Sequence, residues 1–150
     1  MLMNTFHKLS PFLLVVFIVF TLQSCGEHDA PKNLDSNDCR PQLTKCNTTV
    51  AGITAAFWLE QEEYANEIPL PINIMLSESS AVVIGSQLTG DNMYMGYIPV
   101  LLDQHKVGHF KGDMYLASCT QNDMRWILTL EVQKANAEVI EFQFVFSGPN

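Results

Sequence analysis

Apolar and polar residues alternate along the last third of the chain. Over residues 126–133 every second position is apolar, and these positions are Trp126, Leu128, Leu130 and Val132. Residues 140–146 repeat the pattern with Ile140, Phe142, Phe144 and Phe146. A period of two is typical of a β-strand that buries one face and exposes the other. The pattern therefore predicts two strands, with Trp126 and Phe144 turned inward and Thr129 turned outward.

Segments of similar character, separated by turn residues, precede these two. They cover residues 50–59, 70–76, 81–88, 93–102 and 110–119, whereas residues 61–67 are the one candidate for a helix. Pro69 and Pro71 favour a strand that begins at a sheet edge, because proline lacks the N–H that an interior strand donates. About seven short strands at regular spacing predict an all-β fold, an immunoglobulin-like antiparallel β-sandwich.

The first 24 residues have a different pattern. They contain no acidic residue, one lysine (Lys8) and an apolar run over residues 11–22. This run is shorter than the roughly 20 residues that cross a bilayer, and it suits the core of a secretory signal. It ends in the letters LQSC at residues 22–25, which resemble the lipobox of bacterial lipoproteins. That resemblance implies cleavage after Ser24 and lipidation of Cys25.

The same resemblance predicts how the chain is organised. Residues 1–24 are expected to be a signal peptide, residues 25–38 a polar linker behind the lipid anchor, and residues 39–150 the β-sandwich domain. Gly26 follows the cysteine at a position where lipoproteins of the inner membrane often carry aspartate. We therefore expect an outer-membrane lipoprotein whose domain faces the periplasm. The alternative is a soluble secreted protein in which Cys25 is an ordinary thiol.

Charge and motifs exclude several functions. Sixteen acidic residues against eight basic ones give a net charge of −8, which repels phosphate backbones and excludes nucleic-acid binding. The chain has no G-x-S-x-G, no H-E-x-x-H and no glycine-rich phosphate loop, so we expect a protein that is not an enzyme. His105 and His109 flank one turn and could bind a metal together, although a solvated hairpin is the commoner outcome.

The cysteines leave two arrangements open. Once Cys25 is lipidated, Cys39, Cys46 and Cys119 remain, an odd number for an oxidising compartment. A Cys39–Cys46 disulfide would staple the start of the domain. A disulfide from either of them to Cys119 would tie the N-terminal segment to the sheet instead.

Four sulfur-containing residues form a candidate copper site. Met93 and Met95 are two apart on a predicted strand, which places both side chains on one face with Cα atoms about 7 Å apart. Cys119 and Met124 bracket the turn between the next two strands. Thioether and thiolate sulfurs are soft ligands that select Cu(I). The alternative is that these side chains fill gaps in the core, as methionine often does.

Residues 82–146 resemble the YtkA-like and FixH-like group of small exported β-sandwich domains. The matching features are a Met-containing loop, a Gly-aromatic-x-Gly strand, a Met-x-Trp strand entry and a closing aromatic strand. The residues that carry them are Met93, Met95 and Gly96; Gly108, Phe110 and Gly112; Met124 and Trp126; and Phe142, Phe144 and Phe146. The resemblance implies an immunoglobulin-like fold and a role around copper and cytochrome oxidase assembly.

The sequence departs from the periplasmic oxidase copper chaperones, which use a histidine with several methionines. No histidine falls between Met75 and His105, so no ligand set is carried over from them. Two functions are therefore expected. One is Cu(I) binding or delivery by Met93, Met95, Cys119 and Met124, and the other is a metal-free interaction or structural module of the envelope that holds a partner protein.

Overall fold

The computed structural model describes residues 39–120 and 123–149, which form nine β-strands and no helix. Cys25, the expected signal peptide and the expected linker lie outside the described residues. The strands are β1 (Cys46–Val50), β2 (Ile53–Leu59), β3 (Leu70–Leu76), β4 (Val82–Gly90), β5 (Ile98–Pro99), β6 (Leu101–Lys106), β7 (His109–Met114), β8 (Arg125–Gln133) and β9 (Val139–Ser147). The described part of the chain contains no helix long and apolar enough to cross a membrane.

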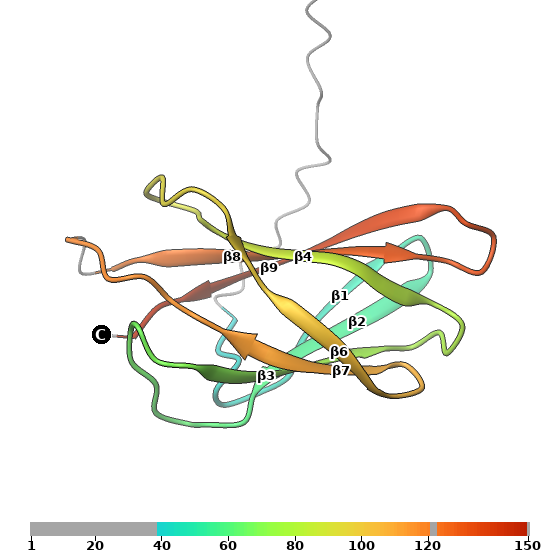
Figure 1. Ribbon diagram of the computed structural model, residues 1–150, viewed down its shortest axis with the longest axis horizontal. Helices are drawn as coiled ribbons and strands as arrows, with labels where there is room; N and C mark the ends of the chain where they lie inside the picture. The colour runs from blue at the N-terminus through green and yellow to red at the C-terminus, as the bar shows by residue number, and fades with distance from the viewer. Residues whose placement is uncertain (1–38, 121–122, 150) are drawn as a thin grey trace, which may run out of the picture. The chain divides into compact units, whose positions relative to one another are not determined.

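The strands form two antiparallel sheets (Figure 1). One sheet has five strands in the order β1-β2-β3-β7-β6, and the other has four in the order β5-β4-β8-β9. The prediction of an all-β fold with two antiparallel sheets, consistent with a β-sandwich, is confirmed. The immunoglobulin-like connectivity stays a prediction.

The core consists of the inward side chains of both sheets. Trp126 is 0 % exposed and Phe144 3 %, as the alternation predicts. Phe57 of β2 has its ring centroid 5.5 Å from those of Phe144 and of Phe146 on β9. Burying each such side chain contributes roughly 1.5–3 kcal/mol, so these contacts hold the two sheets together.

Residues 50–59 are not one strand. Ala51 and Gly52 have φ angles of 49° and 81° and form a two-residue turn between β1 and β2. Positive φ at both central residues is the geometry of a type I′ turn, whose twist matches that of the flanking strands. The alternation from Ile53 to Leu59 is real, but Ala51 belongs to the turn and is exposed.

Two further expectations are wrong. Residues 61–67 form bends and turns and not a helix. Strand β3 lies inside its sheet, between β2 and β7, although it begins with Leu70 and Pro71. The carbonyl of Pro71 accepts a hydrogen bond from Glu60, so the proline nitrogen faces the point where β2 has already ended at Leu59. Proline therefore costs the ladder only one hydrogen bond at its very end, because Pro71 has no N–H with which to return the bond from Glu60.

A disulfide joins the edges of the two sheets. Cys39 forms an isolated bridge with Phe146 of β9, and Cys46 is the first residue of β1. The structure pairs Cys39 with Cys46, with their Cα atoms 5.8 Å apart. This is the first of the two arrangements that the sequence leaves open, and Cys119 lies elsewhere, half-buried in the segment between β7 and β8.

Candidate functional site

Met93 and Met95 lie in the loop of residues 91–97, between β4 and β5. The prediction that they share one face of a strand is wrong, because the chain has no ladder partner after Gly90 until Ile98. The side chain of Met93 is 37 % exposed, whereas Met95 packs against the core.

Hydrogen bonds fasten this loop to the start of β8. Asn92 Nδ2 donates to the carbonyl of Asp123 at 2.7 Å, and Asn92 Oδ1 accepts from the backbone N–H of Arg125 at 2.9 Å. The backbone N–H of Asp91 also donates to the carbonyl of Arg125, and the two side chains form an ion pair at 3.2 Å. The loop that carries Met93 and Met95 therefore adjoins the segment that carries Met124.

Three of the four sulfur-containing side chains, those of Met95, Cys119 and Met124, pack in or against the core. Met124 is 6 % exposed, and its Cε lies 2.6 Å from where a Cβ on Gly90 would stand, a position that the carbonyl oxygen of Met93 also blocks. Cys119 packs against the core, as do Met95 and Met124. Within residues 39–120 and 123–149, no three His, Cys, Asp or Glu side chains gather as a metal site.

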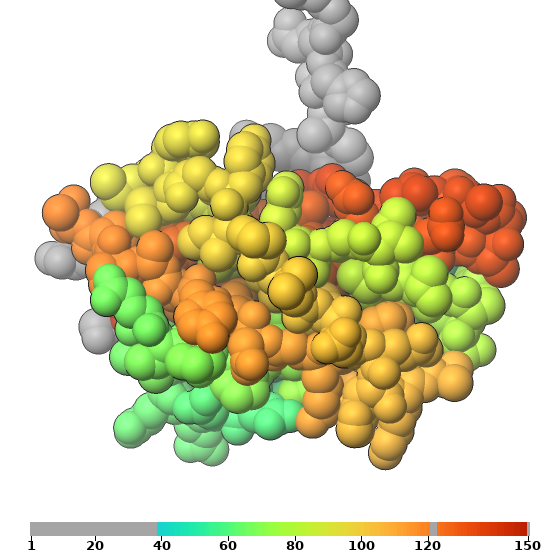
Figure 2. Space-filling view, viewed as in Figure 1, coloured from blue at the N-terminus to red at the C-terminus, as the bar shows by residue number. Residues whose placement is uncertain are grey.

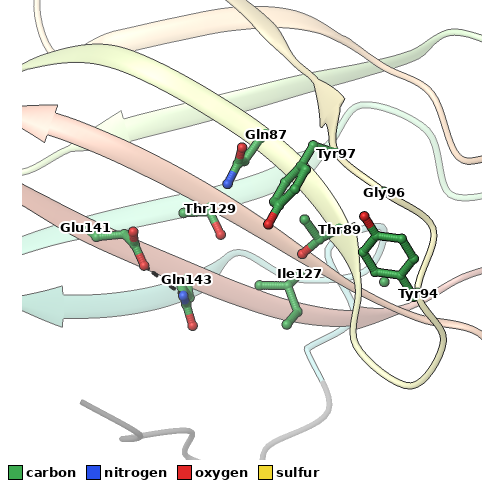
Figure 3. Close-up of a pocket in the computed structure, with 10 residues that line it drawn as sticks. Gln87, Thr89, Tyr94, Gly96, Tyr97, Ile127, Thr129, Glu141 and Gln143 are labelled. Atoms are coloured by element: carbon green, nitrogen blue, oxygen red, sulfur yellow. Dashed lines mark hydrogen bonds between the residues drawn. The ribbon is translucent and has the colours of Figure 1, made fainter. Parts of the chain in front are cut away.

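A groove on the outer face of the four-stranded sheet lies beneath the same loop (Figure 3). Its volume is about 270 Å³. Its floor comprises Gln87 and Thr89 of β4, Ile127 and Thr129 of β8, and Glu141 and Gln143 of β9, and its wall comprises Tyr94 and Tyr97. We refer to it as the tyrosine groove.

Strand register builds the floor of the groove. Gln87 lies opposite Thr129 across β4 and β8, and Thr129 lies opposite Gln143 across β8 and β9. Thr129 lies on the outer face, as predicted, but it is only 7 % exposed because its two glutamine neighbours flank it at the bottom of the groove. Truncation of Thr129 is therefore not expected to be neutral, although the residue lies on the outer face.

The two tyrosines were not singled out by the sequence analysis. Tyr94 is 85 % exposed and Tyr97 70 %, and Gly96 between them has a φ of 70°, which turns the loop back towards β5. Figure 3 shows Tyr94 at one end of the groove, Glu141 at the other, and Tyr97 between them beside Gln87. In Figure 2 the loop stands out from the body of the domain in yellow. The sequence feature that could have indicated this site is the presence of two tyrosines and a glycine within a turn-rich segment.

Histidine and tryptophan occupy the outer face of the five-stranded sheet. The rings of Trp58 and His109 stack with centroids 5.7 Å apart, and the rings of His105 and His109 meet edge to face at 5.5 Å. Lys45 Nζ lies 4.1 Å from the centroid of the Trp58 ring, a cation–π distance. The two histidines thus lie together, as the spacing around their turn indicates.

A hydrogen-bond chain fixes His109. Its Nε2 lies 2.8 Å from Asn73 Oδ1, Asn73 Nδ2 donates to Glu60 Oε1 at 3.1 Å, and Lys111 Nζ donates to the same oxygen at 2.6 Å. The hydrogen bond from Lys111, and then that from Asn73, lower the pKa of Glu60. Burial is the main cause that lowers the pKa of His109, and neighbouring cations add to it.

Comparison with known proteins identifies no relative, since no family model, no curated protein and no solved structure matches this chain.

Proposed function

We propose that this protein is a membrane-tethered binding module of the bacterial envelope and that its ligand lies in the tyrosine groove. The observation that carries the proposal is the pair of exposed tyrosines, Tyr94 and Tyr97, beside a concave sheet face to which several polar side chains contribute. Exposed aromatic rings at the rim of a pocket with convergent polar groups are typical of binding surfaces. This develops the interaction-module expectation by giving it a surface.

The tether is the lipid expected on Cys25, which would hold the domain at the periplasmic side of the outer membrane. Acyl chains contribute roughly 0.8 kcal/mol per buried methylene, so several chains anchor a domain stably. The proposed role is binding and not catalysis. Among the described residues that line the groove, Glu141 is the sole carboxylate, and no histidine, cysteine or lysine lies beside it to act as its partner.

Substitution of the lipidated residue tests the tether. The full-length Cys25→Ser variant, expressed in a bacterium, should lose membrane partitioning and signal processing, because no thiol remains to be acylated. Cell fractionation and the mass of the protein measure both effects. Membrane association of the variant at the level of the parent would contradict the lipoprotein proposal.

Site-specific photo-crosslinking tests the surface. A photoreactive phenylalanine analogue at position 94 of the full-length protein in cells should form an adduct with an envelope component. The matched control is position 107 in the turn between β6 and β7, where Val107 is 72 % exposed. Adducts from both positions alike, or from neither, would contradict the proposal.

Cu(I) binding is a second candidate function, and one specific observation favours it. The loop that carries Met93 and Met95 is fastened through Asn92 to Asp123 and Arg125, the residues on either side of Met124. In this second proposal Met93, Met95, Cys119 and Met124 together bind one Cu(I) ion, for delivery in copper handling or in cytochrome oxidase assembly. The softness of thioether and thiolate sulfur is the chemical reason.

Copper titration tests this candidate. The reduced full-length protein should bind about one Cu(I), with Zn(II) competing poorly because thioethers are weak ligands for it. Joint replacement of Met93 and Met95 by leucine keeps side-chain volume and should weaken copper retention, and Cys119→Ser should weaken it further. Met75→Leu, at a methionine that is 41 % exposed on β3, is the control. Unchanged retention in the double variant would show that these sulfurs only pack.

A further inference from the structure

We infer that the ligand of the tyrosine groove is a neutral oligosaccharide. The inference rests on the proposed function, since it names the class of ligand for the same groove. It is carried by the combination of aromatic rings, uncharged hydrogen-bonding side chains and the absence of cations among the residues that line the groove.

The two tyrosines provide stacking surfaces. Their side chains are 85 % and 70 % exposed, and in Figure 3 the Tyr94 ring lies at one end of the groove and the Tyr97 ring nearer its middle. A tyrosine ring presents an apolar face and a hydroxyl that stays in contact with water. The C–H groups on one face of a pyranose ring match that apolar face, and the hydroxyls around the sugar match the wet edge.

The floor provides a row of groups that both donate and accept hydrogen bonds. Gln87, Thr129 and Gln143 lie opposite one another on three neighbouring strands. Neighbouring strands are about 4.8 Å apart, so this row spans about 10 Å, enough for more than one sugar ring. Amides and hydroxyls each donate and accept, as sugar hydroxyls do, so each can be satisfied by a saccharide.

Glu141 lies on β9 two residues before Gln143, beside the row and not in it, since its cross-strand partner is Glu131. Gln143 Nε2 donates to Glu141 Oε1 at 2.7 Å, which orients the amide so that its oxygen is turned to accept a hydrogen bond. A carboxylate forms strong hydrogen bonds with hydroxyl donors. An extended ligand that stacks on the tyrosines can therefore reach a strong acceptor at the opposite end.

Charge and geometry disfavour other ligands. None of the described residues that line the groove is Lys, Arg or His, and the net charge of −8 repels anions. A small ammonium ion held against the Tyr94 ring would be remote from Glu141, at the other end of the groove (Figure 3). A peptide that binds by strand addition needs a free sheet edge, whereas this groove lies across the faces of β4, β8 and β9.

Calorimetric titration of the full-length protein in detergent tests the inference. The probes are the N-acetylglucosamine tetramer and cellotetraose, which separate recognition of the acetamido group from recognition of the bare pyranose chain. Binding of either supports the inference. Tyr94→Ala and Tyr97→Ala should each weaken binding by about tenfold or more, because each removes a stacking surface.

Matched variants separate stacking from folding. Tyr94→Phe and Tyr97→Phe keep the rings and should stay within about threefold of the parent. Tyr115→Ala, at a tyrosine that is 48 % exposed outside the groove, should leave the affinity unchanged. Gln143→Ala should weaken binding, whereas Gln104→Ala on β6 of the other sheet should not.

The outcomes distinguish this inference from the proposed function. If neither tetrasaccharide binds but position 94 still forms an adduct in cells, the ligand is not a saccharide and the binding module stands. If neither tetrasaccharide binds and no adduct forms, both are overturned. If a tetrasaccharide binds equally to the parent and to the Tyr94→Ala and Tyr97→Ala variants, its site is elsewhere and the inference is overturned.

Discussion

Asn73 is only 2 % exposed although it points to the outer face of β3, where strand alternation predicts a solvated residue. Its amide contacts His109 on one side and Glu60 on the other, so a buried polar group has its hydrogen bonds satisfied. Thr129 on the other sheet also lies on an outer face and is only 7 % exposed. At the scale of the residue, alternation predicts the face on which a side chain lies, but the size of its cross-strand neighbours decides whether water reaches it.

The surroundings of His109 predict how the free energy of unfolding depends on pH. Burial, followed by repulsion from His105, Lys111, Lys106 and Lys45, lowers the pKa of His109 below its usual 6.5. The unfolded chain therefore binds more protons than the folded protein at mildly acidic pH. The free energy of unfolding should fall as the pH drops from about 6.5 through the lower folded-state pKa. Glu60 stays ionised in this window, because its own pKa lies below the usual 4.5.

Urea denaturation at about pH 7 and about pH 5 measures the effect. The parent should lose more stability between these values than His109→Gln, in which the titrating group is absent. Gln104→Ala, on the neighbouring strand, should follow the parent. Equal losses in the parent and in His109→Gln would contradict the assignment to this histidine.

At the scale of the element, β8 and β9 could be predicted almost completely, because each buries one face of an extended run and their register pairs Trp126 with Phe146. The loop of residues 91–97 could not be predicted from its sequence. Its mixture of methionine and tyrosine resembles a strand locally, but a strand also needs a partner, and that depends on the path of the rest of the chain. For the same reason the turn at Ala51 and Gly52 could not be predicted, since these two residues lie inside an apolar run.

Core truncations test the strand register. Trp126→Ala and Phe144→Ala should each lower the free energy of unfolding by about 3–5 kcal/mol, through lost burial and the cavity that remains. Val139→Ala is the outward control on β9, where the side chain is 51 % exposed, and it should change stability by less than about 0.5 kcal/mol. Chemical denaturation measures all three variants. A loss at Val139 as large as at Phe144 would contradict the register.

At the scale of the whole molecule, the outer faces of the two sheets differ in chemistry. The five-stranded sheet carries Lys45, Trp58, His105, His109 and Lys111, whereas the tyrosine groove on the four-stranded sheet has no cation in its lining. The sequence predicted the fold class and singled out the sulfurs and histidines. It could not predict the groove, because the floor residues of β4 meet those of β8 and β9 only through the pairing of β4 with β8, strands that are not consecutive in the chain.

The central claim is that the ligand lies on the outer face of the four-stranded sheet, beneath residues 91–97. The most direct test is an amide NMR spectrum of the full-length protein in detergent, titrated with the N-acetylglucosamine tetramer. Chemical shift changes should cluster at residues 87–97, 127–129 and 141–143, which form the groove and its loop. Changes centred on Trp58 and His109 of the other sheet, with none in the groove, would contradict the account.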